Sequence, residues 1–178
     1  MRAVLFLIVL FFVSCKAKIE SVYFNGDKYV GELQDGKPNG SGKMLFKNRD
    51  TYVGDWKNGM FDGKGLITYA CGESYSGEFV NSIRSGRGTY VYPDSTKFEG
   101  VFKNCELNGI CTAYFSKGDI FVGDFVYSKQ VGKGVYTWIS GGKYSGECKD
   151  FIPNGQGTFT WPNGNLYKGK WKNGKQDG

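Results

Sequence analysis

The chain has no histidine among its 178 residues, and only four prolines and three methionines. Without histidine there is no Ser-His-Asp or Cys-His catalytic arrangement and no His-ligated metal site. The longest apolar run, residues 3–13, has eleven residues. As a helix it would span only ~16 Å, about half of a bilayer core. These shortages argue against a histidine-dependent enzyme and against a transmembrane helix.

Glycine and aromatic residues, in contrast, are abundant. There are 28 glycines, about 16% against a usual share of roughly 7%. A disordered glycine-rich linker would lack the aromatic residues, which make up 17% of the chain, and collagen would place glycine at every third position. The composition therefore indicates a folded protein that needs glycine and aromatic rings for structural reasons.

The start of the chain has the layout of a secretory signal, with a basic residue, a short apolar run and then small residues. Residues 12–15, Phe-Val-Ser-Cys, resemble a bacterial lipobox, although Phe12 stands where leucine is usual. We interpret residues 1–14 as a signal peptide, Cys15 as the lipid attachment site and residues 15–21 as a lipid-anchored tether. A conventional signal peptide cleaved nearby, for instance after Ala17, and an uncleaved hydrophobic start are the alternatives.

Each alternative implies an exported protein. We expect a lipid-anchored protein of a bacterial cell envelope, with the outer membrane favoured over the inner, and a secreted protein as the alternative. Removing Arg2 lowers the formal charge from +6 to +5. We interpret this mild basicity mainly as a means of solubility, with weak attraction to anionic phospholipid or acidic partners as the alternative. Lysine and arginine are spread along the chain and export removes nucleic acid as a partner, so we expect no nucleic-acid binding.

From residue 22 onward the sequence repeats every 23 residues. We count positions within a unit from its first aromatic residue. Glycine occupies positions 3 and 12 of every unit, and position 18 is aromatic wherever the unit reaches it. A half unit precedes six full units and a partial seventh, so we expect a repeat array over residues 22–178. Position 1 is Tyr29, Tyr52, Tyr75, Phe98, Phe121, Tyr144 and Tyr167.

Each unit is predicted to form a β-hairpin. Residues 52–56 alternate large apolar with polar side chains, residues 57–65 have turn chemistry, and residues 66–69 are β-branched and aromatic. Short connections allow only antiparallel pairing of neighbouring strands. The sequence therefore predicts an all-β fold, an elongated antiparallel meander of about thirteen strands in a single twisted sheet of stacked hairpin repeats.

The alternation of side chains puts positions 1, 3 and 5 on one face. A glycine inside a strand costs ~0.5–1 kcal/mol, so its recurrence at position 3 needs a steric reason. We expect a ring from a neighbouring strand, such as Tyr90 or Tyr92 at positions 16 and 18, to lie over each of these glycines. The opposite face is polar, and we interpret its acidic residues at position 4 as a solvated charge ladder rather than catalytic carboxylates.

The unit Tyr-x-Gly-(Glu/Asp)-(Trp/Phe)-x-x-Gly…Gly-x-Gly resembles the MORN repeat, the membrane occupation and recognition nexus motif. Residues 52–65 and 167–174 match it most closely, and the resemblance covers residues 22–178. It implies a curved, elongated sheet of stacked hairpins with an aromatic-lined groove. It also implies binding roles, namely scaffolding, protein association and phospholipid contact.

The aromatic face is the one surface for which the sequence suggests a function. A single sheet has no second layer to bury this face, and large apolar patches are seldom left exposed. Either the rings pack on one another and leave a partial groove, or a helix, a second copy or lipid covers them. The candidate groove residues are Trp56, Tyr69, Phe79, Tyr92, Phe102, Phe125, Trp138 and Trp161.

The four cysteines after Cys15 lie at four different repeat positions, so a rigid meander would keep them apart and we expect no metal site. Cys105 and Cys111 replace loop glycines and flank one hairpin loop. They could form a disulfide in an exported protein, or serve as small apolar filler, as Cys148 does at an aromatic position.

We therefore expect a non-enzymatic MORN-repeat envelope lipoprotein that acts as a protein-binding scaffold, with no catalytic residue, cofactor or metal. One alternative is a phospholipid-binding module that associates with membrane through the repeat array itself. Another is a eukaryotic secreted or organelle-associated MORN scaffold. The sequence does not identify the partner protein or the oligomeric state.

Overall fold

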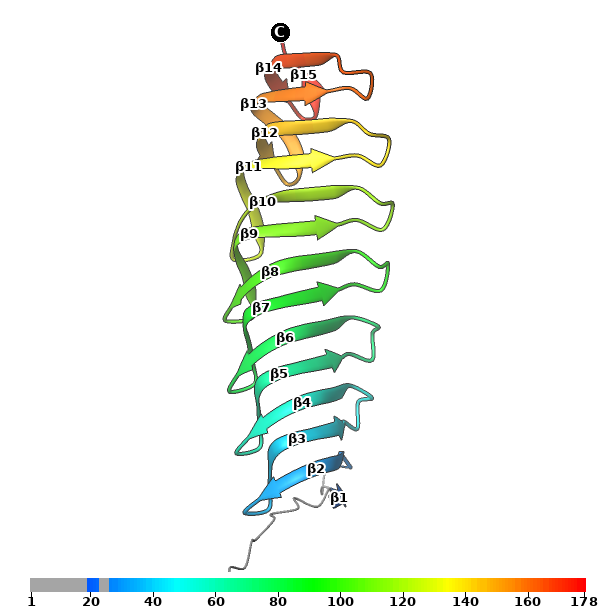
Figure 1. Ribbon diagram of the computed structural model, residues 1–178, viewed down its shortest axis with the longest axis vertical. Coiled ribbons are helices and arrows are strands. Elements are labelled where there is room, and N and C mark those ends of the chain that lie inside the picture. Colours follow the sequence, from blue (N-terminus) through cyan, green and yellow to red (C-terminus); the bar gives the residue numbers. More distant parts are fainter. Residues whose placement is uncertain (1–18, 23–25) are drawn as a thin grey trace, which may run out of the picture.

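One antiparallel sheet makes up the fold. The computed structural model describes residues 19–22 and 26–178, and these contain no helix, hence none that could cross a membrane. Fifteen strands follow one another in chain order across the sheet (Figure 1). The predicted all-β meander of stacked hairpins is confirmed. The strands are β1 (Ile19–Val22), β2 (Lys28–Gln34), β3 (Lys37–Leu45), β4 (Thr51–Lys57), β5 (Met60–Thr68), β6 (Ser74–Val80), β7 (Ile83–Val91), β8 (Lys97–Lys103), β9 (Glu106–Tyr114), β10 (Ile120–Val126), β11 (Lys129–Thr137), β12 (Lys143–Lys149), β13 (Ile152–Thr160), β14 (Leu166–Lys172) and β15 (Lys175–Gln176).

The array begins earlier than expected. Strand β1 pairs with β2 from Ile19, which pairs with Gly31, so three residues assigned to the tether belong to the sheet. The rest of the predicted tether, Cys15 and the predicted signal peptide lie outside the described residues.

The hairpin turns are shorter than predicted. In the second unit only Asn58 (φ 52°) and Gly59 (φ 84°) form the turn, and two successive left-handed residues are typical of a type I′ turn. Strand β5 already begins at Met60, so the prediction of a turn over residues 57–65 is wrong. Gly63, with φ 109°, lies instead beside a β-bulge where the register of β4 and β5 shifts.

A row of glycines runs across the sheet at positions 3 and 14. Gly54 pairs with Gly65 within a hairpin, and Gly65 pairs with Gly77 in the next. A Cβ atom added to Gly65 would lie 2.5 Å from Cε2 of Tyr52. The ring over the glycines therefore comes from position 1 of the same hairpin, and the expectation that positions 16 and 18 supply it is wrong.

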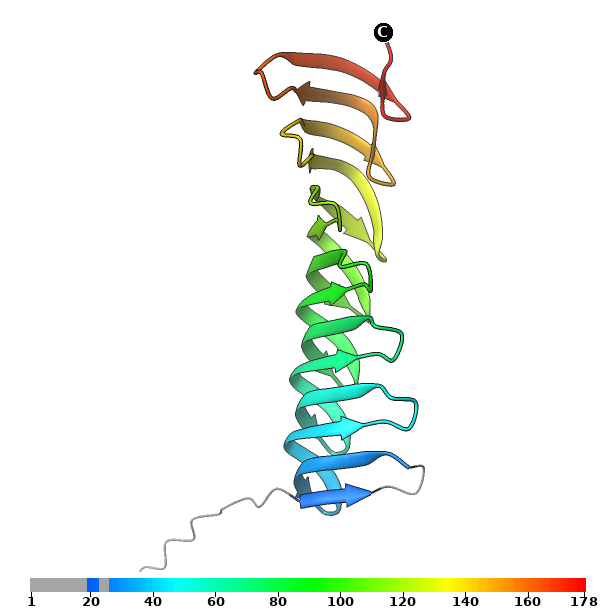
Figure 2. The same cartoon turned by 90° about the vertical axis from the view of Figure 1, so that its right-hand side faces the viewer.

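The strands bend at this glycine row, and the bend builds the core. Phe61 is the cross-strand partner of Trp56, yet its ring stacks on Tyr52 with centroids 3.7 Å apart. On a flat strand, Trp56 and Tyr52 would be ~13 Å apart, so β4 must curve for the hairpin end to reach Tyr52. The 90° view shows this curvature in successive hairpins and the twist along the array (Figure 2). Because of this curvature, five of the position-1 rings are fully buried: Tyr29, Tyr52, Tyr75, Phe121 and Tyr144.

Candidate binding surface on the ring face

The eight predicted groove residues separate into two layers on the face that carries positions 1, 5, 16 and 18, which we call the ring face. Four of them are buried against the position-1 rings: Trp56, Phe79, Phe102 and Phe125. The other four, at position 18, form a partly open rim: Tyr69 and Trp138 are half-buried, whereas Tyr92 and Trp161 are 40% and 38% exposed. Most of the ring face is thus self-packed, and the rim is what a partner could reach.

The rim rings recur with identical backbone geometry. The N–H of each position-18 residue donates to the carbonyl four residues later, as in Tyr69 to Glu73 (2.9 Å) and Tyr92 to Thr96 (2.8 Å). Consecutive rim rings are therefore two strands apart, or ~9.6 Å. Rings at position 16 support them, with centroids 5.0 Å apart for Tyr90–Tyr92 and 4.3 Å apart for Tyr136–Trp138.

A recess of about 170 Å³ interrupts the ring face in the third and fourth units. Its cause is Cys111 at position 14, because a Cβ on Gly100 would lie 2.5 Å from Sγ of Cys111 rather than against Phe98. The sulfur takes the place that a position-1 ring occupies elsewhere. Phe98 is consequently half-buried and packs toward Tyr92, with ring centroids 5.9 Å apart. Besides Phe98 and Tyr92, the recess is lined by Arg84, Tyr90, Phe102 and Cys105.

Arg84 is a candidate binding residue that the sequence analysis missed. Its guanidinium lies over the rings of Tyr90, Tyr75 and Phe102, with carbon-to-centroid distances of 4.9, 5.6 and 5.9 Å. It also donates a hydrogen bond to the carbonyl of Cys105 (3.1 Å). The available signal was its place in the repeat, because every other residue at position 10 is uncharged: Pro38, Phe61, Leu107, Gln130, Pro153 and Gln176.

A tyrosine–carboxylate pair holds one wall of the recess. The Tyr90 hydroxyl donates to Oε2 of Glu73 at 2.6 Å. Burial, together with this hydrogen bond, raises the pKa of Tyr90 above its usual value. The phenol therefore stays protonated at neutral pH and contributes no charge to balance Arg84.

The disulfide considered between Cys105 and Cys111 is not formed, since both are free thiols. Cys105 lies in the turn before β9, and Cys111 follows five residues along that strand. Their separation of six residues corresponds to roughly 20 Å of extended chain, whereas bridged Cα atoms lie within about 7 Å. Burial raises the pKa of the Cys111 thiol to about 11, which agrees with the alternative role of apolar filler.

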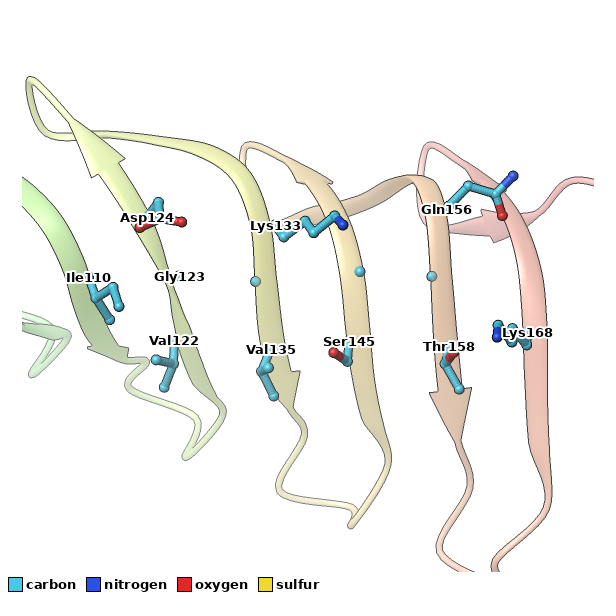
Figure 3. A pocket seen from close by; sticks show the side chains of 13 residues that line it. Ile110, Val122, Gly123, Asp124, Lys133, Val135, Ser145, Gln156, Thr158 and Lys168 are labelled. Carbon is cyan, nitrogen blue, oxygen red and sulfur yellow. The ribbon is translucent and has the colours of Figure 1, made fainter.

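The opposite face carries a shallow trough (Figure 3). Val122 and Val135 line one side and Asp124 and Lys133 the other, with the glycine row as its floor and a volume of about 480 Å³. Two similar depressions of about 500 and 510 Å³ lie over the same register in earlier units. Because it recurs, the trough is a consequence of the glycine row rather than a specific site. Within residues 26–178, no three Cys, Asp or Glu side chains converge in a metal-binding group.

Comparisons with known proteins agree with this architecture. A family model described as "MORN repeat" matches residues 29–51, 52–72, 75–97, 121–143, 144–166 and 167–178. The unit without a match, residues 98–120, is the one that contains Cys105 and Cys111. No curated protein matches the sequence.

Two solved structures share the fold at low sequence identity. One is the SAS-4 (dCPAP) TCP domain of Drosophila melanogaster in complex with a proline-rich motif of Ana2 (dSTIL), with TM-score 0.53 and 16% identity, covering 96% of this chain and 97% of that one. The other is the wild-type TCP10 domain of Danio rerio CPAP, with TM-score 0.56 and 14% identity, covering 86% and 72%.

Proposed function

This chain belongs to the MORN repeat family, and we propose that it is a non-enzymatic scaffold that binds a partner protein through the rim of its ring face. The observation that carries this proposal is the exposure of two rim rings in an otherwise self-packed layer, Tyr92 beside the recess and Trp161 three units farther along the rim. Exposed aromatic side chains next to a concave site are the residues that most often anchor protein interfaces.

The comparison with the fly TCP domain supports an extended peptide as the kind of partner, because that domain was solved with a proline-rich motif. The largest depressions on the described part of the array are open rather than enclosed. The array does offer a long row of equivalent rings, along which an extended chain could lie.

Crosslinking at defined positions tests the scaffold. A photoreactive residue in place of Tyr92 or Trp161 should capture one and the same protein in intact cells. The matched control is Val101, which is 46% exposed and belongs to the opposite face of β8. Capture at Val101 alone, or at no position, would overturn the proposal.

The proposal also includes export and a lipid anchor on Cys15 in a bacterial envelope. Metabolic labelling with palmitate should label the wild-type protein and leave Cys15→Ala unlabelled. Label that survives in Cys15→Ala, or that is missing from the wild type, would exclude a lipid anchor on Cys15. Neither result would contradict the scaffold function.

One observation favours phospholipid binding by the array itself as a second candidate. The penultimate strand, β14, carries Lys168, Lys170 and Lys172, all exposed, and such a cluster attracts anionic surfaces. The Cys15→Ala protein should then co-sediment with phosphatidylglycerol vesicles at low salt and dissociate as salt screens the charges. Absence of binding at low salt would exclude this candidate.

A further inference from the structure

Arg84 has no direct ion-pair partner among the described residues, and the nearby carboxylate of Glu73 is linked to it only through the Tyr90 hydroxyl. The side chain is half-buried on the ring face, and within the described part of the chain no carboxylate lies within 4 Å of its guanidinium. The ion pair that forms between two described residues joins Lys97 to Glu99 (2.9 Å) and does not involve Arg84. A guanidinium has five N–H donors and remains charged at any physiological pH. One donor bonds to the Cys105 carbonyl, so other donors remain for an acceptor placed in the recess.

The surroundings of Arg84 suit a carboxylate carried by a side chain. Arg84 is the one cation in the lining of the recess. The other lining residues are Tyr90, Tyr92, Phe98, Phe102, Cys105, Leu107 and Ser128. A phosphate group usually needs several cations or backbone N–H groups, whereas one arginine is enough to bind a carboxylate through two hydrogen bonds. Partial burial in the recess strengthens such a pair relative to one in open water.

The spacing of the rim rings suits one backbone conformation. A polyproline II helix advances 3.1 Å per residue with three residues per turn, so every third residue recurs after about 9.3 Å. That distance is close to the ~9.6 Å between rim rings two strands apart. One α-helical turn advances only 5.4 Å and two turns ~10.8 Å, so neither stays in step over several units.

Arginine occupies position 10 in the third unit alone, and this would set the register of a bound chain. In the sixth unit the residue at the turn position of Cys105 is Phe151. Its ring packs against Phe121, Phe115 and Phe125 with centroids 5.1, 5.6 and 5.9 Å apart. Phe151 thereby fills the space next to the recess. A chain lying along the rim would therefore meet this arginine at the recess that Tyr92 also lines.

We propose that the partner is a polyproline II segment with one acidic side chain that enters the recess and pairs with Arg84, while its other residues stack on the rim rings. This inference rests on the proposed binding of a protein by the ring face, and it adds the chemistry of the partner and its register.

Two synthetic peptides test the proposal. Both have thirteen residues, twelve prolines and a central glutamate or glutamine, and both carry fluorescein at the N-terminus. Their affinity for the full chain in mild detergent is measured by fluorescence anisotropy at low salt. We expect the glutamate peptide to bind about tenfold more tightly, the low end of what a hydrogen bond to a charged group contributes.

Variants of the protein distinguish the contribution of the Arg84 charge to peptide affinity from that of the rim rings. Arg84→Gln should abolish the preference for glutamate, with a larger loss of affinity for the glutamate peptide than for the glutamine peptide. Tyr92→Ala should weaken both peptides. The matched control is Arg87→Gln, three residues away on the opposite, exposed face of β7, which should keep the preference. A peptide with central lysine should bind the wild type least, which tests the charge even if Arg84→Gln fails to fold.

Equal binding of the glutamate and glutamine peptides, or no binding of either, would overturn the proposal. So would loss of the preference in Arg87→Gln, or displacement of the peptide by phosphatidylglycerol vesicles that depends on Arg84. If the glutamate and glutamine peptides bind equally well but the crosslinks at Tyr92 and Trp161 still form, the polyproline II partner is excluded and the scaffold function is not. Absence of those crosslinks would contradict the proposed scaffold function itself.

Discussion

At the scale of single residues, the protein depends on contacts between a ring and two glycines. The ring of Tyr52 lies over Gly54 and Gly65, and the same arrangement recurs where Tyr75 lies over Gly77 and Gly88. The fourth unit shows the effect of replacing one such glycine, because Cys111 displaces Phe98 and opens the recess. The glycines are therefore close-packing positions rather than flexible ones.

Replacing one of these glycines should destabilise the sheet. In Gly65→Ala the new Cβ would be 2.5 Å from Cε2 of Tyr52, and such overpacking typically costs ~1–3 kcal/mol in the free energy of unfolding. Urea denaturation measures the loss. Ser76→Ala, on the exposed opposite face of β6, should change stability by no more than about 0.5 kcal/mol. Equal stability of the two variants would contradict the packing described for Tyr52.

The cysteines should differ in reactivity. Burial raises the pKa of both the Cys111 and the Cys148 thiol to about 11, so roughly one molecule in a thousand carries a thiolate at pH 8. Cys71 is exposed. Iodoacetamide should therefore modify Cys71 first, and Cys111 and Cys148 only after unfolding or as the pH approaches 11. Mass spectrometry of the digested protein gives the order, and early modification of Cys111 would contradict its burial.

At the scale of the hairpin, the acidic residue at position 4 has a structural role that the sequence pattern did not show. Asp55 Oδ2 accepts the N–H of Lys64 at 2.9 Å, and Glu147 Oε2 accepts that of Gln156 at 2.9 Å. These N–H groups lie beside the bulge glycine. The interpretation of position 4 as a solvated charge ladder is therefore incomplete, because its carboxylates bind the backbone next to the bulge.

Removing such an acceptor should weaken the hairpin. Asp55→Ala leaves the N–H of Lys64 without its partner, and we expect a loss of about 1 kcal/mol, the typical net value of a hydrogen bond. Asp55→Asn keeps an acceptor oxygen and should lose less. Thermal denaturation of both variants makes the comparison. A loss equal in the two would mean that charge, and not the hydrogen bond, is what Asp55 contributes.

At the scale of the whole molecule, the fold is nearly one-dimensional. Each strand pairs only with its neighbours in chain order, so stability should grow with the number of units. The long axis in Figure 1 follows this order from β1 to β15. Changes in one unit, such as those that create the recess, can therefore be accommodated without altering distant units.

Deletion of one complete unit tests this independence. Without residues 52–74, Thr51 joins Tyr75 and the repeat stays in register, so the chain should fold with a urea m-value lower by roughly one seventh. Deletion of residues 52–59 removes only β4 and its turn, which breaks the antiparallel order, and this variant should not fold cooperatively. Circular dichroism during urea titration compares the two. An unfolded 52–74 deletion would contradict the nearest-neighbour organisation.

Spacing along the chain was enough to predict the antiparallel meander and the gathering of rings on one face. Pairing within a hairpin is local, and the alternation of side chains is a property of any extended backbone. Spacing could not predict that Phe61 reaches Tyr52, which ring covers each glycine, or that Cys111 moves Phe98 and leaves a recess beside Arg84. Those features depend on how far each strand bends at its glycine, and the bend is set by the packing of side chains that meet only in the folded sheet.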